Sequence, residues 1–125
     1  MLVALNTLSA ALSAFKEFTK DHDVQVQALQ TFLIIATSPN PSVEDITRTI
    51  GLSQATTSRN LKKLAVGPRA QEGYGLITVE LDPYDGRKRV IRLSVRGHEL
   101  IRFIEDRTMP KLRRHFINEL ILKPT

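Results

Sequence analysis

Residues 50–64 read IGLSQATTSRNLKKL, and this stretch decides the fold. Gly51 supplies the left-handed backbone conformation in which helices commonly end. Ser53 is a favoured residue just before a helix, and we expect that helix to run from Gln54 to about Ala65. Its apolar residues one turn apart predict its buried face. They are Leu61 and Leu64.

The residues before this stretch predict a partner helix. Ser42, with Asp45 three positions later, resembles a capping box that begins a short helix. Val43, Ile46 and Ile50 are spaced to face inward from it. Two short helices joined by a tight glycine turn form a helix-turn-helix.

After this motif the period of the pattern changes from helix to strand. Ile77, Val79 and Leu81 alternate with polar residues, and a second alternation covers residues 89–95. The sequence DPYDG at 82–86 between them is rich in turn formers. We therefore expect a β-hairpin with a basic tip at Arg87, Lys88 and Arg89.

Helices are expected on both sides. Leu5, Leu8, Leu12 and Phe15 form one apolar stripe of a first helix. Asp23 is expected to cap a helix over residues 24–37, and Ser94 to cap a last helical region. Pro110 should kink or divide that region. A second apolar stripe lies beyond it, at Leu112, Phe116, Leu120 and Ile121.

These elements predict a mainly α protein with one small β-hairpin, a winged helix-turn-helix flanked by helices. The expected division is an N-terminal helix over 1–22, a winged helix-turn-helix domain over 23–97, and C-terminal helices over 98–125. The two stripes are expected either to complete the chain's own core or to form a subunit interface.

The charge is concentrated where the motif lies. The chain has 125 residues and a net charge of +5. Residues 53–97 carry 9 basic and 4 acidic side chains, which favours a polyanionic partner. The absence of cysteine excludes disulfides and thiolate chemistry. No secretory signal or membrane-spanning run is expected, so we predict a cytoplasmic, nucleoid-associated protein.

Catalytic and metal sites are not expected. His22, His98 and His115 lack the spacing of a zinc site. Asp82 and Asp85 lie among turn residues, where Asp serves turn geometry rather than catalysis. We expect no enzyme activity, no metal and no cofactor.

The order of the motifs resembles one family, the MarR family of bacterial winged-helix transcription regulators. IGLS at 50–53, TSR at 57–59 and the leucines at 61 and 64 are similar to its L-G-L-S-x-S-T-V-S-R-x-L-x-x-L pattern. GLI at 75–77, DPYDGR at 82–87 and LSVRG at 93–97 are similar to its G-L-I … D-x-x-D-x-R … L-T-x-x-G pattern. The resemblance covers about residues 46–97.

The resemblance implies a regulator that binds DNA as a two-fold dimer, with Arg87 matching the arginine that commonly enters the minor groove. Elementary chemistry agrees, because a helix with outward polar side chains fits the major groove. A helix N-terminus also holds phosphate, and a basic hairpin tip suits the negative minor groove. The expected DNA-binding residues are Ser53, Gln54, Thr56, Ser58, Arg59, Lys62, Lys63, Arg87, Lys88 and Arg89. The expected dimer interface is Leu5, Leu8, Leu12, Phe15, Leu112, Phe116 and Leu120.

Three departures from the family pattern stand out. The connection from Leu64 to Gly75 is longer than usual, and Arg69 within it is a further candidate for phosphate contact. Thr57 replaces a common valine, and Gly86 replaces a common arginine. The flanking helices are shorter than usual, which leaves the family's small-molecule effector open for this chain.

Three function classes follow from these observations. The first is a sequence-specific regulator of transcription, expected to be a repressor acting at a pseudo-palindromic duplex site. The second is a winged-helix accessory of replication or DNA packaging. The third is a winged helix that grips another protein.

Overall fold

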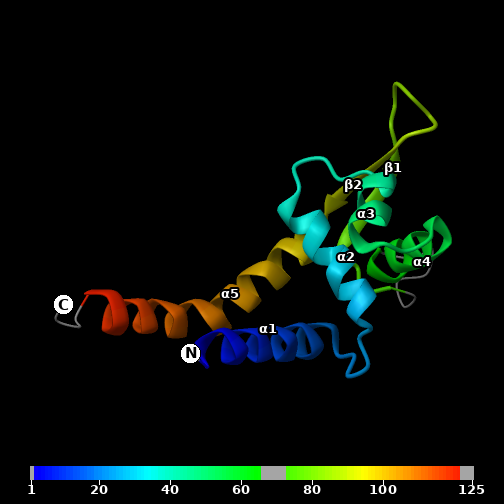
Figure 1. Cartoon of the computed structure of the whole chain (residues 1–125). Helices are drawn as coiled ribbons and strands as arrows, with labels where there is room; N and C mark the ends of the chain where they lie inside the picture. Colours follow the sequence, from blue (N-terminus) through cyan, green and yellow to red (C-terminus); the bar gives the residue numbers. More distant parts are fainter. Residues whose placement is uncertain (1, 66–72, 122–125) are drawn as a thin grey trace. The chain divides into compact units, whose positions relative to one another are not determined.

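The computed structural model describes residues 2–65 and 73–121, without the side chains of residues 120 and 121. Five α-helices and one hairpin follow each other along these residues (Figure 1). They are α1 (Val3–Thr19), α2 (Val26–Thr37), α3 (Val43–Ile50), α4 (Gln54–Leu64), β1 (Ile77–Leu81), β2 (Arg89–Leu93) and α5 (Val95–Phe116). A π-helical turn, Ile117–Ile121, follows α5. The predicted α+β class is confirmed. None of the described helices is both long and apolar enough to cross a membrane.

Two compact units make up the chain. One comprises residues 24–98, and the other comprises residues 1–23 together with 99–125. The boundary falls within the first turns of α5, so this helix contributes to both.

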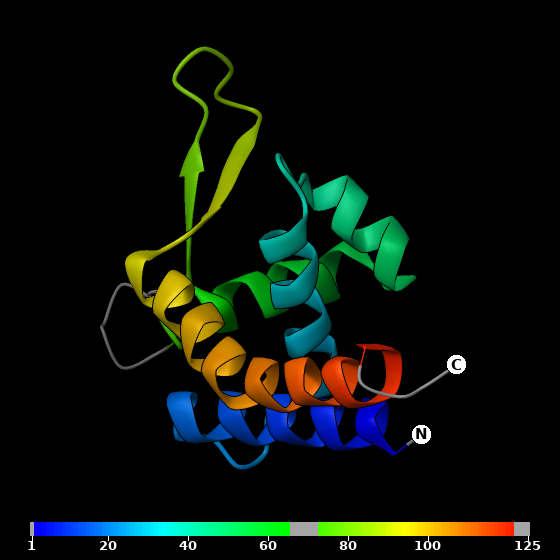
Figure 2. The same cartoon turned by 90° about the vertical axis from the view of Figure 1, so that its left-hand side faces the viewer.

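The unit of residues 24–98 is a winged helix-turn-helix. Helices α2, α3 and α4 pack on one another, and the hairpin contacts α2 and α4 at its base. Strands β1 and β2 are antiparallel, with Val79 opposite Ile91. The hairpin extends beyond the three helices, as Figure 2 shows. Apolar side chains from every element fill the core of this unit. They are Ala28, Phe32, Ile35, Ile46, Leu61, Leu64, Leu76, Ile77 and Ile91.

The helical unit pairs α1 with the part of α5 that follows residue 98 (Figure 2). The rings of Phe18 and Phe103 lie with their centroids 5.6 Å apart. Arg107 donates two hydrogen bonds to the Glu17 carboxylate, at 2.7 and 3.2 Å, and its guanidinium lies 4.3 Å from the Phe103 centroid. The pKa of Glu17 is lowered, chiefly because Arg107 donates to its charged form.

The structure corrects three local predictions, on Asp23, Val95 and Pro110. Asp23 does not cap α2, which begins at Val26 without a side-chain cap. The reason is distance along the chain, because a cap lies directly before the first helical residue. The amide of Asp23 instead donates to the Asp21 carboxylate at 2.9 Å. Val95, which the expected alternation over residues 89–95 assigned to the strand, begins α5 and is 77% exposed, because β2 ends at Leu93.

Pro110 does not divide the last helix. α5 continues through it to Phe116. Proline removes one backbone donor, but the face of α5 away from it continues without interruption. Leu100 and Thr108 are buried on that face, and Ile104 and Leu112 are half-buried at the same four-residue spacing. Packing of this face therefore outweighs one lost backbone hydrogen bond.

Candidate nucleic-acid interface

Both helices of the helix-turn-helix begin as the sequence predicts. The Ser42 hydroxyl accepts the amide of Asp45 at 3.0 Å, and the Ser53 hydroxyl accepts the amide of Thr56 at 3.2 Å. Gly51 ends α3 with a φ of 77°. These contacts fix where each helix starts and therefore which residues of α4 face solvent.

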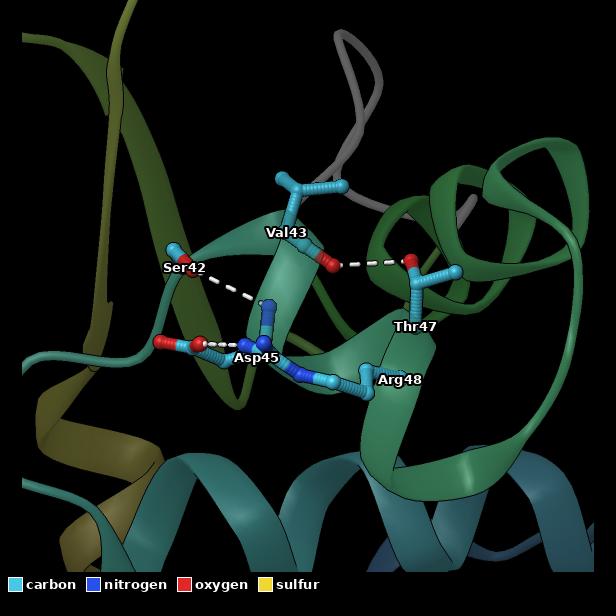
Figure 3. A network of polar contacts seen from close by, with 5 residues as sticks. All are labelled: Ser42, Val43, Asp45, Thr47 and Arg48. Atoms are coloured by element: carbon cyan, nitrogen blue, oxygen red, sulfur yellow. Dashed lines mark hydrogen bonds and ion pairs between the residues drawn. The ribbon is translucent and has the colours of Figure 1, made fainter.

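An ion pair between Asp45 and Arg48 lies near the start of α3. Figure 3 shows Asp45 between Ser42 and Arg48, with Arg48 donating to its carboxylate. The pKa of Asp45 is lowered, first by its hydrogen bonding with Ser42 and then by the charge of Arg48. Arg48 remains exposed on α3.

A part-buried pair of hydroxyls joins α3 to α4, and the sequence reasoning missed it. The hydroxyls of Thr47 and Thr57 lie 2.8 Å apart, and Thr57 is completely buried. Thr47 also donates to the carbonyl of Val43 at 2.7 Å, as seen in Figure 3. The departure from valine at position 57 is therefore half of a hydrogen-bonded pair. The signal was present in the sequence as two threonines, one on each helix.

The predicted residues of α4 reach the surface. Ser53, Gln54, Arg59, Lys62 and Lys63 are exposed, and Thr56 and Ser58 are half-buried. The Arg59 guanidinium donates to the Thr56 hydroxyl at 3.2 Å, which orients it near the start of the helix.

Lys63 has a neighbour that the sequence did not predict. Its ammonium lies 5.0 Å from the ring centroid of Tyr74, and the amide of Tyr74 donates to its carbonyl. The cation–π contact with the Tyr74 ring thus helps to orient the Lys63 side chain. Arg69 lies outside the described residues, as does the conformation of residues 66–72.

The tip of the hairpin is built by its two aspartates. The Asp82 carboxylate accepts the amides of Tyr84 and Asp85, at 2.8 and 3.3 Å. The Asp85 carboxylate accepts the amide of Arg87 at 3.1 Å. Both carboxylates therefore serve the turn. Arg87, Lys88 and Arg89 are all exposed beside them.

A groove of about 580 Å³ brings the helix-turn-helix and the hairpin together. Gln54 and Ser58 of α4 line it on one side, and the three basic residues of the hairpin line it on the other. Ser42 and Glu44 at the start of α3 also contribute. Five of the ten predicted DNA-binding residues thus share one groove, namely Gln54, Ser58, Arg87, Lys88 and Arg89.

The base of the hairpin is fixed to α5 by close backbone contact. The Ser94 hydroxyl donates to the carbonyl of Gly75 at 2.6 Å and accepts the amide of Gly97 at 3.0 Å. A Cβ on Gly97 would lie 2.1 Å from the carbonyl oxygen of Leu76. In the Leu-Ser-x-x-Gly pattern at 93–97, Ser94 is therefore the cap of α5, and Gly97 occupies a position where only glycine fits.

The predicted dimer residues divide into three groups. Leu5, Leu8, Leu12 and Phe116 are exposed, by 63, 57, 37 and 51%, and Leu2 adds to them at 67%. Leu112 is half-buried, and the side chain of Leu120 lies outside the described residues. Phe15 is only 1% exposed, so its assignment to a surface is corrected: the side chain already belongs to the core of a single chain.

Within residues 2–65 and 73–121, no group of three His, Asp or Glu side chains is placed to hold a metal ion. His22 lies between α1 and α2, whereas His98 and His115 lie near opposite ends of α5.

Comparison with known proteins identifies the fold. No protein-family model matches the chain, and no curated protein matches it. Solved structures do match, at low sequence identity. The MepR–DNA complex of S. aureus is 17% identical, with a TM-score of 0.68, over 97% of this chain and 82% of that one. A MarR-family regulator from Rhodococcus is 20% identical, with a TM-score of 0.56, over 95% and 75%.

A third match is Bordetella bronchiseptica BpsR, whose DNA binding is regulated by 6-hydroxynicotinic acid. It is 17% identical, with a TM-score of 0.56, over 90% of this chain and 80% of that one. The architecture is therefore a winged helix-turn-helix with flanking helices. More particularly, it is the fold of the MarR-type transcriptional regulators that the sequence motifs resemble.

Proposed function

We propose that this chain is a MarR-family regulator that binds double-stranded DNA at a specific sequence and represses transcription there. The groove between α4 and the hairpin carries this proposal. It joins hydrogen-bonding side chains at the start of a helix to a row of three exposed cations. Hydrogen-bonding side chains read base edges, and cations hold the phosphates beside them.

The roles divide between the two sides of the groove. α4 enters the major groove, with Gln54 and Arg59 suited to adenine and guanine edges. Ser53, Thr56 and Ser58 supply further hydrogen bonds, and Lys62 and Lys63 contact phosphates. The hairpin reaches the minor groove, where Arg87 meets the most negative potential. Lys88 and Arg89 hold the adjoining backbone.

The apolar face of α1 supports a homodimer. Leu2, Leu5, Leu8 and Leu12 follow one another along α1 and are exposed in the single chain. A second copy related by a two-fold axis would cover them with the same residues. Two recognition helices would then meet half-sites about 10 base pairs apart on a pseudo-palindrome.

Selection of bound sequences from a random duplex pool tests the proposal, with binding repeated at two salt concentrations. We expect an inverted repeat, bound more weakly at the higher salt. Tight binding at low salt without an enriched sequence would instead indicate a general DNA accessory. The absence of any binding would contradict the proposal and favour a protein partner.

Arg87→Ala checks the assignment of the hairpin. We expect weaker binding to most sequences alike and a salt dependence reduced by about one unit of slope. Lys20→Ala, on the exposed end of α1, is the matched loss of one positive charge and should leave the slope unchanged. Loss of discrimination at one base pair alone would contradict a groove or phosphate contact.

A further inference from the structure

Tyr84 lies at the tip of the hairpin and is 99% exposed. Turn chemistry does not require an aromatic residue there, because the two aspartates provide the side-chain hydrogen bonds of the loop. Tyrosine buries 150–250 Å² when it finds a partner, at a low cost in conformational entropy. An unburied ring at this place is therefore well suited to an intermolecular contact.

The loop holds the backbone of Tyr84 in a defined place. The amide of Asp82 donates to the carbonyl of Lys88 at 2.9 Å, and the amide of Lys88 donates to the carbonyl of Asp85 at 3.0 Å. The amide of Tyr84 itself donates to the Asp82 carboxylate at 2.8 Å. Five hydrogen bonds connect residues of this short loop, so little ordering of its backbone is left to occur on binding.

The surroundings of the ring indicate its partner. Arg87, Lys88 and Arg89 are exposed in the same loop and the strand that follows it. Leu81, which pairs with Arg89 across the hairpin, is 66% exposed. The far half of the hairpin thus presents apolar and cationic groups together. The minor groove of DNA offers both partners, because its walls are sugar rings and its edges are phosphates.

We propose that the ring of Tyr84 packs against the deoxyribose wall of the DNA groove that the hairpin enters, beside the arginine. This assignment rests on the proposed function and adds an apolar contact to it. The contact strengthens binding without neutralising a phosphate. It therefore differs measurably from the contact of a cation, which releases counterions from the DNA.

Salt dependence separates the two kinds of contact. The probe is the duplex enriched in the selection above or, without enrichment, a mixed-sequence 30-base-pair duplex at low salt. We expect Tyr84→Ala to weaken binding roughly tenfold at each salt concentration, with the salt slope unchanged. Tyr84→Phe keeps the ring and should bind within about twofold of the unaltered protein. Val26→Ala removes another exposed apolar side chain, on α2, and should have no effect.

Fluorescence tests the contact directly. The chain has two tyrosines and no tryptophan, so the Tyr74→Phe variant reports on Tyr84 alone. We expect acrylamide to quench this signal efficiently in the free protein and several-fold less efficiently with the duplex bound. DNA binding confirmed by electrophoretic shift, with quenching unchanged, would overturn the proposal.

The outcomes distinguish this proposal from the function on which it rests. If the unaltered protein binds DNA and Tyr84→Ala binds equally well, the ring contact is wrong and the regulator stands. A reduced salt slope for Tyr84→Ala would also overturn an apolar contact. If the unaltered protein does not bind duplex DNA at either salt concentration, both proposals fail together. Because the ring is 99% exposed, Tyr84→Ala should retain the thermal unfolding temperature of the unaltered protein.

Discussion

The two compact units of the chain present their sequence patterns differently. In the winged unit, individual residues have identifiable structural roles. Ser53 caps α4, Gly51 ends α3, and Gly97 leaves room for the carbonyl oxygen of Leu76. In the helical unit, the pattern is a stripe of leucines, and most of its members remain exposed. A local motif therefore predicts the backbone geometry of its own residues. An apolar stripe predicts only that another surface covers it, and does not identify that surface.

Gly97→Ala is expected to have the largest effect. It tests the close contact between Gly97 and the Leu76 carbonyl oxygen in the winged unit. The added methyl group would lie 2.1 Å from the Leu76 carbonyl oxygen, so the backbone must move. We expect a loss of about 3 kcal/mol or more in the free energy of unfolding, measured by urea denaturation. Gly86→Ala is the control, because its Cβ meets nothing within 4 Å. Equal stability of the two variants would refute the close contact.

Leu8→Glu tests the stripe in the helical unit. We expect a carboxylate in the centre of the apolar face of α1 to weaken self-association at least a hundredfold, about 2.7 kcal/mol. Sedimentation should then change from twice 14.1 kDa to 14.1 kDa at tens of micromolar. Asn6→Glu places the same charge at an exposed polar position of α1. If the unaltered protein already sediments at 14.1 kDa, the proposed dimer is wrong.

Arg59→Ala returns to the winged unit and tests base reading by α4. Arg59 is exposed and held near the helix start by Thr56. We expect a loss of about 1–3 kcal/mol for the selected site and relaxed preference at one base pair. Competition with point-substituted duplexes measures both quantities. Unchanged affinity and specificity would remove Arg59 from the interface.

The ion pair of the helical unit should have the smallest effect, and it depends on pH. The pKa of Glu17 is lowered by Arg107, so the folded state favours the carboxylate. This contribution is complete above the ordinary Glu pKa of 4.5 and is lost as pH falls through the lowered value. Arg107→Gln should therefore reduce the unfolding temperature slightly at about pH 7 and hardly at about pH 3. If the unfolding temperature of Arg107→Gln fell further below that of the unaltered protein as the pH is lowered, this prediction would be contradicted.

The sequence predicted most of the winged unit because its signals are local. Both serine caps, the glycine turn and the alternation of the hairpin are each defined within a few residues. The pair Thr47–Thr57 was missed because it depends on how two helices cross. Of the two expected effects of Pro110, a division of the helix was wrong: proline removes one backbone bond, whereas α5 continues through the packing of Leu100, Ile104 and Thr108. Phe15 was misassigned because periodicity does not distinguish the covered edge of a stripe from its exposed edge.

The two backbone hydrogen bonds of Leu76 bear on the order in which the chain folds. Its amide donates to the carbonyl of Leu64 at 2.8 Å, and its carbonyl accepts the amide of Ser94 at 3.0 Å. One residue thus connects the end of α4, the base of the hairpin and the start of α5. The outermost of these residues, Leu64 and Ser94, are 30 positions apart in the sequence. Such short loop closures favour rapid nucleation. We therefore expect the winged unit to fold early, before any partner chain is met.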